Sequence, residues 1–419
     1  MDARRAAEMA VRNSYGRLIA YVASRTRDVA AAEDALGDAF LMALKTWPEK
    51  GVPHNPESWL VVSARNRLID AARRNRVHEN VLETLKLSSL QSQPASPDPS
   101  EIFPDDRLKL LFICSHPAID ATMHTPLMLQ TVLGLNAAQI ASAFLVPPAT
   151  MSQRLVRAKT KIRDAGIAFE LPEVDELPSR LAAVLEAIYA AYTHAWETLK
   201  GGDPRHRGLA EEAIWLARLC VQLMPQAPES RGLLALMLYC EARRDARRSA
   251  NGAYIPLAQQ DTRLWSQSMI DEAESELAHA ATLKQLGRFQ LEAAIQSLHT
   301  QRAVTQQVDW ETLVLLYEGL IQLSPTLGAF VSYAAAIAEA KGLEQGLVCL
   351  NTLPTEAVKT YQPYWALKAH LLQRLERKLE AQQAYSRAIG LTEDATVREF
   401  LLHQSSQLDE LPPAQPAYA

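Results

Sequence analysis

The sequence predicts an all-α protein: two small helical domains joined by a flexible linker, followed by a larger domain of helical repeats. Three observations support this prediction. Apolar residues recur at three- and four-residue spacing along most of the chain. A segment rich in Ser, Pro and Gln interrupts this pattern at 79–104, and the chain from about residue 179 repeats a helix-pair pattern. A chain of 419 residues is also too long for one ordinary core.

The first predicted domain covers residues 1–78 and begins with helices between residues 5 and 47. The second of these helices runs from Ala30 to Trp47 and has an apolar stripe at helical spacing. The stripe that we expect to face inward comprises Ala35, Leu36, Ala39, Phe40, Ala43 and Leu44. Glu33, Asp34 and Asp38 are expected on the outer face, which is therefore acidic.

A third helix is predicted from Pro56, after a loop that contains Gly51 and Pro53. Its first half is apolar. Its second half carries a dense group of basic residues, namely Arg65, Arg67, Arg73, Arg74 and Arg76. Arginine, asparagine and an aromatic residue at one helix end suit stacking on single-stranded bases and contacts with phosphates. An amphipathic bundle helix with a charged tail would show the same pattern.

A helix-turn-helix is predicted over Leu135 to Arg163, within a second domain at 105–169. Pro147 disfavours helical geometry at Val146, and Pro148 suits the first turn of the next helix. In that helix we expect an inward face made of Met151, Leu155, Ala158 and Ile162. Its polar side comprises Thr150, Ser152, Gln153, Arg154, Arg157, Lys159 and Lys161. Such a side can contact phosphates and base edges in a major groove, although a solvated basic face has the same composition.

The distribution of charge favours nucleic-acid binding by these two domains. The whole chain has a formal net charge of −5, but residues 1–78 hold 13 Lys and Arg against 9 Asp and Glu. Residues 105–169 hold 7 basic against 4 acidic residues, whereas residues 170–419 hold 22 against 31. Two basic modules therefore precede a large acidic one, and a protein or small ligand is the partner that we expect for the acidic part.

Residues 179–408 are predicted to be tetratricopeptide-like, and residues 409–419 to be a frayed tail. Four segments place small or aromatic residues at matching positions of a helix pair. The clearest copy contains Trp365, Ala369, Ala381, Tyr385 and Ala388. Stacked helix pairs form a concave binding surface without chemistry of their own, and generic helical hairpins are the alternative.

Other classes of protein are disfavoured. The chain has no Gly-rich phosphate loop, no metal-spaced ligands and no nucleophile motif, so we expect neither an enzyme nor a cofactor nor a metal site. The first residues carry no apolar signal core, and no stretch approaches the roughly 18–20 apolar residues of a membrane span. We therefore expect a cytoplasmic protein with no membrane contact and with four reduced cysteines.

Residues 1–169 resemble an extracytoplasmic-function (ECF) sigma factor, a bacterial RNA polymerase specificity subunit of the sigma-70 type. The resemblance rests on Ala32 to Phe40, on Trp59 to Arg74 and on the helix-turn-helix, in this order and with this linker. The acidic remainder resembles the tetratricopeptide-like extension of one ECF subgroup. The resemblance implies that residues 1–78 are sigma region 2, that 79–104 are a linker and that 105–169 are sigma region 4.

The resemblance also implies site residues and partners. The partners are bacterial core RNA polymerase and promoter DNA. Polymerase binding is implied for Asp34, Asp38, Phe40 and Trp47. Contact with the opened −10 element is implied for Trp59, Arg65, Asn66, Arg73 and Arg74. Reading of the −35 element is implied for Thr150, Ser152, Gln153, Arg154 and Arg157. One departure is Gly37, where the family often has Gln, which puts one polar contact in doubt.

The sequence thus predicts a sigma factor that directs promoter recognition, DNA opening and initiation, with a helical regulatory domain in the same chain. The first alternative is a helix-turn-helix regulator with a tetratricopeptide sensor, which would bind duplex DNA without polymerase. Residues 33–76 discriminate the two, because a plain regulator needs neither an acidic docking helix nor a basic strand-opening helix. A second alternative is an interaction scaffold whose basic helices are only solvated.

Overall fold

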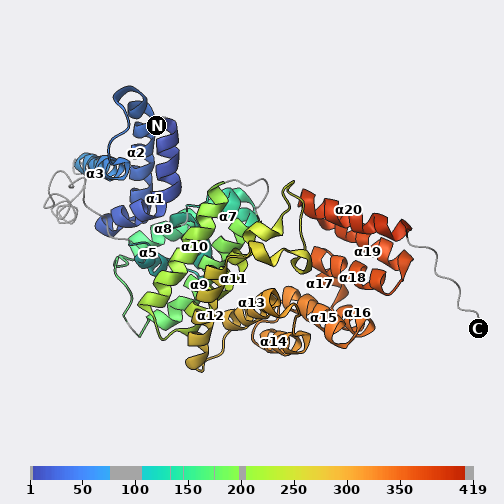
Figure 1. Ribbon diagram of the computed structural model, residues 1–419. Coiled ribbons are helices and arrows are strands. Elements are labelled where there is room, and N and C mark those ends of the chain that lie inside the picture. The colour runs from blue at the N-terminus through green and yellow to red at the C-terminus, as the bar shows by residue number, and fades with distance from the viewer. Residues whose placement is uncertain are drawn as a thin grey trace, which may run out of the picture. The chain divides into compact units, whose positions relative to one another are not determined.

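The computed structural model describes residues 3–75, 106–132, 134–144, 146–173, 175–197 and 204–410. These residues are largely helical and form no β-strand, so the all-α prediction is confirmed. An isolated antiparallel bridge joins Arg248 and Tyr254. The chain divides into two compact units, residues 1–220 and 221–419 (Figure 1). Among the described residues, no helix is both long and apolar enough to cross a membrane.

The first unit begins with a bundle of three helices, α1 (Ala3–Thr26), α2 (Val29–Lys50) and α3 (Pro56–Asn75). Helix α2 starts at Asp28, whose carboxylate accepts a hydrogen bond from the Ala31 N–H at 3.0 Å. It ends at Gly51, which adopts a φ of +83° that favours glycine. Helix α3 starts in the same way, because the Asn55 side chain accepts a bond from the Ser58 N–H at 3.1 Å.

A second group of helices follows, comprising α5 (Arg107–Cys114), η1 (Ala121–Met123), α6 (His124–Thr131), α7 (Ala137–Ala143) and α8 (Pro148–Asp164). Helices α7 and α8 form the predicted helix-turn-helix. Asn136 and Gln139 exchange backbone-to-side-chain bonds of 2.9 and 3.0 Å, which is a capping box at the start of α7. Pro147 is extended and Pro148 opens α8, so the proline pair separates the two helices as predicted.

Two further helices of the first unit are α9 (Leu177–Glu197) and α10 (Pro204–Leu223). Helix α9 packs on α5 and α6. Its Arg180 is buried and donates to the carbonyl oxygen of Phe112, at the end of α5, at 3.3 Å. Apolar residues of α9, including Val184 and Ile188, are fully buried. The helix that begins the predicted extension therefore completes the core beneath the helix-turn-helix.

The second unit is a succession of helices that pack mostly on their neighbours in sequence, except that α13 packs chiefly on α11. They are α11 (Pro228–Ala242), η2 (Arg244–Arg247), η3 (Leu257–Gln259), η4 (Thr262–Leu264), α12 (Gln267–Thr282), α13 (Arg288–Thr305), α14 (Trp310–Leu323), α15 (Leu327–Lys341), α16 (Leu343–Asn351), α17 (Thr355–Val358), α18 (Gln362–Arg374), α19 (Lys378–Leu391) and α20 (Ala395–Glu410). In the α18–α19 pair, Ala369, Ala381 and Ala388 are fully buried and Tyr385 is 2% exposed. Small side chains at these positions let the two helices approach closely.

A half-buried histidine, His299, makes the stability of the second unit depend on pH. Burial, with Arg243 and Arg302 nearby, lowers the pKa of His299 from 6.5 to about 4. Below pH 6.5 the imidazole of His299 binds a proton in the unfolded chain, whereas in the folded unit it binds one only below about pH 4. We therefore expect the free energy of unfolding to fall by about 3 kcal/mol between these pH values. Urea unfolding of the full chain, followed by tryptophan fluorescence, measures this slope. His299→Gln should flatten it, and an unchanged slope in that variant would contradict the assignment.

Candidate nucleic-acid and partner interface

Helix α8 presents a polar face to solvent. Ser152, Gln153, Arg154 and Arg157 are exposed and Thr150 is half-buried. The opposite face holds Met151, Leu155 and Ile162, each 1% exposed, against the rest of the helical group. Together with the buried Ala158, these anchors recur every three or four residues, so they determine which way the arginines point. The structure therefore brings together all five residues predicted to contact duplex DNA in the first turns of one helix.

Lys159 is an exception to the predicted division of α8. It was expected on the polar side, but it is 8% exposed, and its ammonium group donates to Glu33 Oε2 on α2. Glu33 is likewise not on the outer face that the sequence predicts, since its side chain is 14% exposed. Burial raises the pKa of the Glu33 carboxyl, while the positive charge of Lys159 lowers it. These two expectations were wrong because each considered one helix alone.

Helix α3 carries the residues predicted to contact single-stranded DNA. Asn66 is exposed, and Trp59 and Arg65 are half-buried. The side chains of Arg73 and Arg74 lie outside the described residues. The start of α3 is held to α1 by Glu57, whose carboxylate accepts from Ser14 and pairs with Arg17. These two contacts fix the start of α3 against α1, and they thereby set the direction in which the second half of the helix extends.

Helix α2 presents an acidic face that also contains apolar side chains. Asp34 and Asp38 are exposed, as predicted. Leu41 and Leu44 are 59% and 46% exposed on the same helix, so the expectation that Leu44 faces inward was wrong. Helix α2 therefore presents exposed leucines beside exposed carboxylates on its solvent side. Leu41 follows Asp38 by three residues, so the two side chains lie on the same side of the helix. This spacing could have predicted an exposed leucine beside the carboxylates, and the sequence analysis did not use it.

Phe40 and Trp47, which the sequence assigned to partner binding, lie in the core of the three-helix bundle. Phe40 is 9% exposed and Trp47 is 2% exposed. The Trp47 ring meets the Trp59 ring edge to face, with centroids 5.5 Å apart. Both residues are placed to hold α2 against its neighbours and to keep the acidic face in position. The same contact couples α2 to the start of α3.

Gly37 lies on the exposed side of α2, where no neighbouring atom requires a residue without a side chain. It is exposed, and a Cβ atom added there would meet nothing within 4 Å. We expect Gly37→Ala to raise the free energy of unfolding by about 0.5–1 kcal/mol, because glycine loses more backbone entropy in a helix. Gly51→Ala is the matched control and should destabilise the protein, because Gly51 also has open space but has a φ of +83°. Denaturant unfolding measures both, and equal shifts in the two variants would refute this reasoning.

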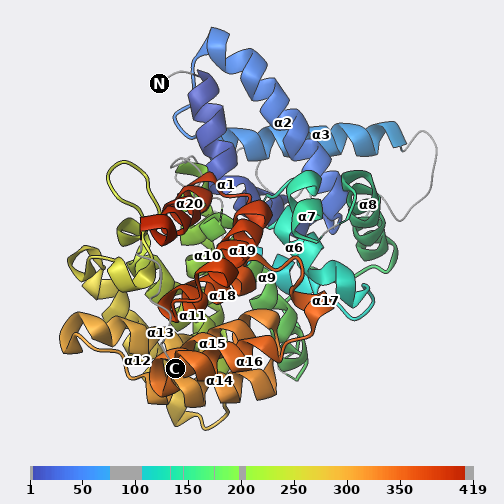
Figure 2. The same ribbon diagram turned by 90° about the vertical axis from the view of Figure 1, so that its right-hand side faces the viewer.

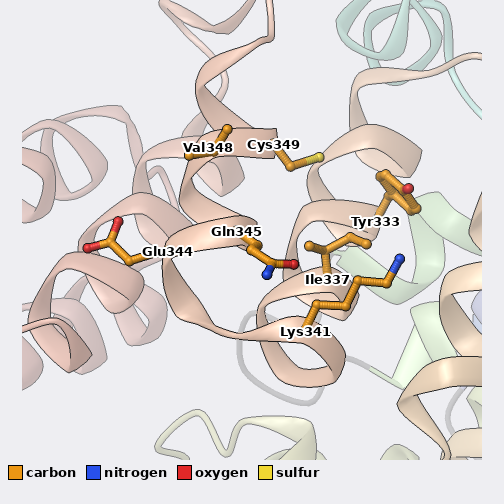
Figure 3. A pocket seen from close by; sticks show the side chains of 7 residues that line it. All are labelled: Tyr333, Ile337, Lys341, Glu344, Gln345, Val348 and Cys349. Atoms are coloured by element: carbon orange, nitrogen blue, oxygen red, sulfur yellow. The ribbon is translucent and has the colours of Figure 1, made fainter.

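The second unit has an open pocket of about 400 Å³ along α15 and α16 (Figure 3). Its lining side chains are Tyr333, Ile337, Lys341, Glu344, Gln345, Val348 and Cys349. The lining therefore combines an aromatic ring, aliphatic side chains and both signs of charge. Within the part of the chain that the structure describes, no group of three or more His, Cys, Asp or Glu is placed to hold a metal ion.

Comparisons with known proteins match separate parts of the chain. Residues 10–77 match the family model described as sigma-70 region 2. Residues 180–281 match a family of unknown function, DUF6596. An uncharacterised protein of Rhizobium meliloti is 39% identical over 394 residues, which cover 93% of this chain and 92% of that protein. The region 2 match includes α2 and α3, which carry the acidic face and the basic half-helix described above.

Proposed function

Since residues 10–77 match sigma-70 region 2, we propose that the chain is an RNA polymerase sigma factor of the ECF type, with a regulatory extension in the same chain. One observation carries the proposal. Two chemically different exposed surfaces, acidic and apolar on α2 and basic on α8, occur on separate modules of one chain. A regulator of duplex DNA needs only the second surface.

In this proposal α2 docks on core polymerase through Asp34, Asp38 and the exposed leucines. Phe40 and Trp47 act indirectly, by holding that face in place. Carboxylates steer and orient the encounter with a basic partner, and the leucines supply apolar area that is lost from water. Core polymerase is thus the first partner, and promoter DNA is the second.

Opening of the −10 element is assigned to α3. Each unstacked base step costs a few kcal/mol, so the opened strand must be held by stacking and by phosphate contacts. We assign base contact to Trp59 and Asn66, and phosphate contact to Arg65, Arg73 and Arg74. Reading of the −35 element is assigned to Thr150, Ser152, Gln153, Arg154 and Arg157 of α8, because such a helix fits a major groove.

The helices from α9 onward form the proposed tetratricopeptide-like regulatory part. The burial of Ala369, Ala381 and Ala388 in a tight helix pair supports the repeat assignment. The pocket along α15 and α16 is the surface we assign to a protein or small ligand.

Transcription in vitro tests the function. The full chain would be added to bacterial core polymerase with a library of genomic fragments from the source organism, and RNA 5′ ends would be sequenced. We expect new start sites that share an upstream motif and that require the protein. Retention of the full chain on duplex DNA, with neither polymerase binding nor new transcripts, would favour the plain regulator. Absence of both kinds of binding would favour the scaffold.

A further inference from the structure

The two DNA-contacting modules are in direct contact in this structure. Lys159 of α8 and Glu33 of α2 form an ion pair in which their side chains are 10% and 14% exposed. Helices α2 and α8 contact each other, and Figure 2 shows one end of α2 beside α8. A buried ion pair requires both partners, because either one alone would leave an uncompensated charge out of water. The pair therefore specifies one arrangement of the two modules.

A second contact between the modules lies on α1. Gly16 packs so closely on the end of α6 that an added Cβ atom would overlap the carbonyl oxygen of Val132. The neighbouring Tyr15 ring lies against Gly134. These backbone contacts are possible only while α1 and the helix-turn-helix module remain together. The ion pair and the Gly16 contact thus belong to one interface.

The extension supports the same interface through Arg107. This residue of α5 is 7% exposed, and its side-chain Cδ lies 3.4 Å from the position of a Cβ atom at Gly16. Its guanidinium pairs with Glu212 and lies over the Trp215 ring of α10, 4.3 Å from the centroid. A change in α10 would therefore reach the junction between the modules through one side chain.

This arrangement cannot engage both promoter elements. Elements at −10 and −35 are separated by about 25 base steps, or roughly 85 Å of straight duplex at about 3.4 Å per step. Here α2 packs on both α3 and α8, which leaves the two DNA-contacting helices only one helix apart. Neighbouring helix axes are about 8–10 Å apart. The 79–104 segment can span roughly 85 Å when extended, so the chain permits separation of the modules.

We propose that this contact is a closed resting state of the chain, that Glu33 and Lys159 form its latch, and that core polymerase opens it by binding α2. The inference rests on the proposed function, because the required separation follows from the two promoter elements. Glu33 directly precedes Asp34 of the docking face, so polymerase and α8 compete for one helix. Because only open molecules bind polymerase, the apparent affinity is the affinity of the open form multiplied by the fraction of molecules that are open.

Single-molecule energy transfer within the full chain tests the latch. Dyes would be attached through non-canonical amino acids at the exposed positions 50 and 164, at the ends of α2 and α8, so that the four cysteines stay untouched. We expect high transfer in the free wild-type protein and low transfer after core polymerase is added. Lys159→Glu should give low transfer without polymerase and should bind polymerase at least 10-fold more tightly.

The charge swap separates a latch from general damage to the fold. Glu33→Lys alone should open the molecule, whereas Glu33→Lys combined with Lys159→Glu should restore high transfer. Gly16→Val should open it without a change in charge. High transfer in both single charge variants would overturn the latch. High transfer in wild-type protein bound to polymerase and active in transcription would overturn the opening step and leave the sigma function intact. If polymerase does not bind at all, the proposed function fails, and the free-protein variants still decide the latch.

Discussion

Reversal of the two exposed carboxylates on α2 is expected to abolish binding of core polymerase. In Asp34→Arg combined with Asp38→Arg, a steering attraction becomes a like-charge repulsion that costs several kcal/mol. A loss of about 4 kcal/mol corresponds to roughly 1,000-fold in the dissociation constant. The fold should tolerate the change, because both residues are exposed and the pair between Asp38 and Arg67 is a solvated contact at 4.0 Å.

A matched control shows whether the loss of binding depends on the position of the substituted carboxylates or only on the change in net charge. Glu170→Arg combined with Glu173→Arg makes the same change in net charge at exposed residues after α8. We expect this control to retain polymerase binding within a few-fold. Pull-down and biolayer interferometry with core polymerase measure both variants. Normal transcription by the α2 variant would remove α2 from the docking surface.

Removal of two arginines from α8 is expected to abolish promoter recognition while leaving polymerase binding intact. Each good bidentate contact between arginine and a base contributes roughly 1–3 kcal/mol of discrimination. Arg154→Ala combined with Arg157→Ala should therefore weaken binding of the −35 duplex by roughly 30-fold to 20,000-fold. Both side chains are exposed, so we expect the free energy of unfolding to change by less than about 0.5 kcal/mol.

The last turn of the same helix provides the control. Lys161→Ala combined with Arg163→Ala removes the same charge from exposed positions one to three turns further along. If these residues contact only phosphates, affinity should fall similarly for every DNA sequence, with a shallower dependence on salt. Fluorescence anisotropy with specific and scrambled duplexes measures the difference. Loss of polymerase binding in the Arg154 and Arg157 variant would contradict the division of roles between α2 and α8.

Local sequence signals were sufficient for the helices and for one face of the candidate site. Pro147 and Pro148 separate α7 from α8 because proline restricts the backbone on both sides of it. The spacing of Met151, Leu155 and Ile162 predicted the buried side of α8, and hence the exposure of Arg154 and Arg157. Such signals act within a few residues, so they can be recognised without knowledge of the tertiary structure.

On α2, the spacing of apolar residues predicted the buried side less accurately. Phe40 was expected to face inward, which its burial confirms, and was also implied to contact polymerase, which a buried ring can support only indirectly. Leu44 fits the apolar stripe by spacing but is 46% exposed. In a three-helix bundle, the two neighbouring helices cover only part of the surface of a helix. The positions of those neighbours decide which residues of the helix remain exposed.

By itself, the sequence determined an all-α chain, the limits of the helix-turn-helix and the two exposed charged faces. Only the tertiary structure decided that Glu33 and Lys159, which are 126 residues apart, bury each other. Each looks like a solvated residue on its own helix, because periodicity reports which face is apolar and not what covers the polar one. Only tertiary packing buries a charge, and it does so where the opposite charge arrives with it.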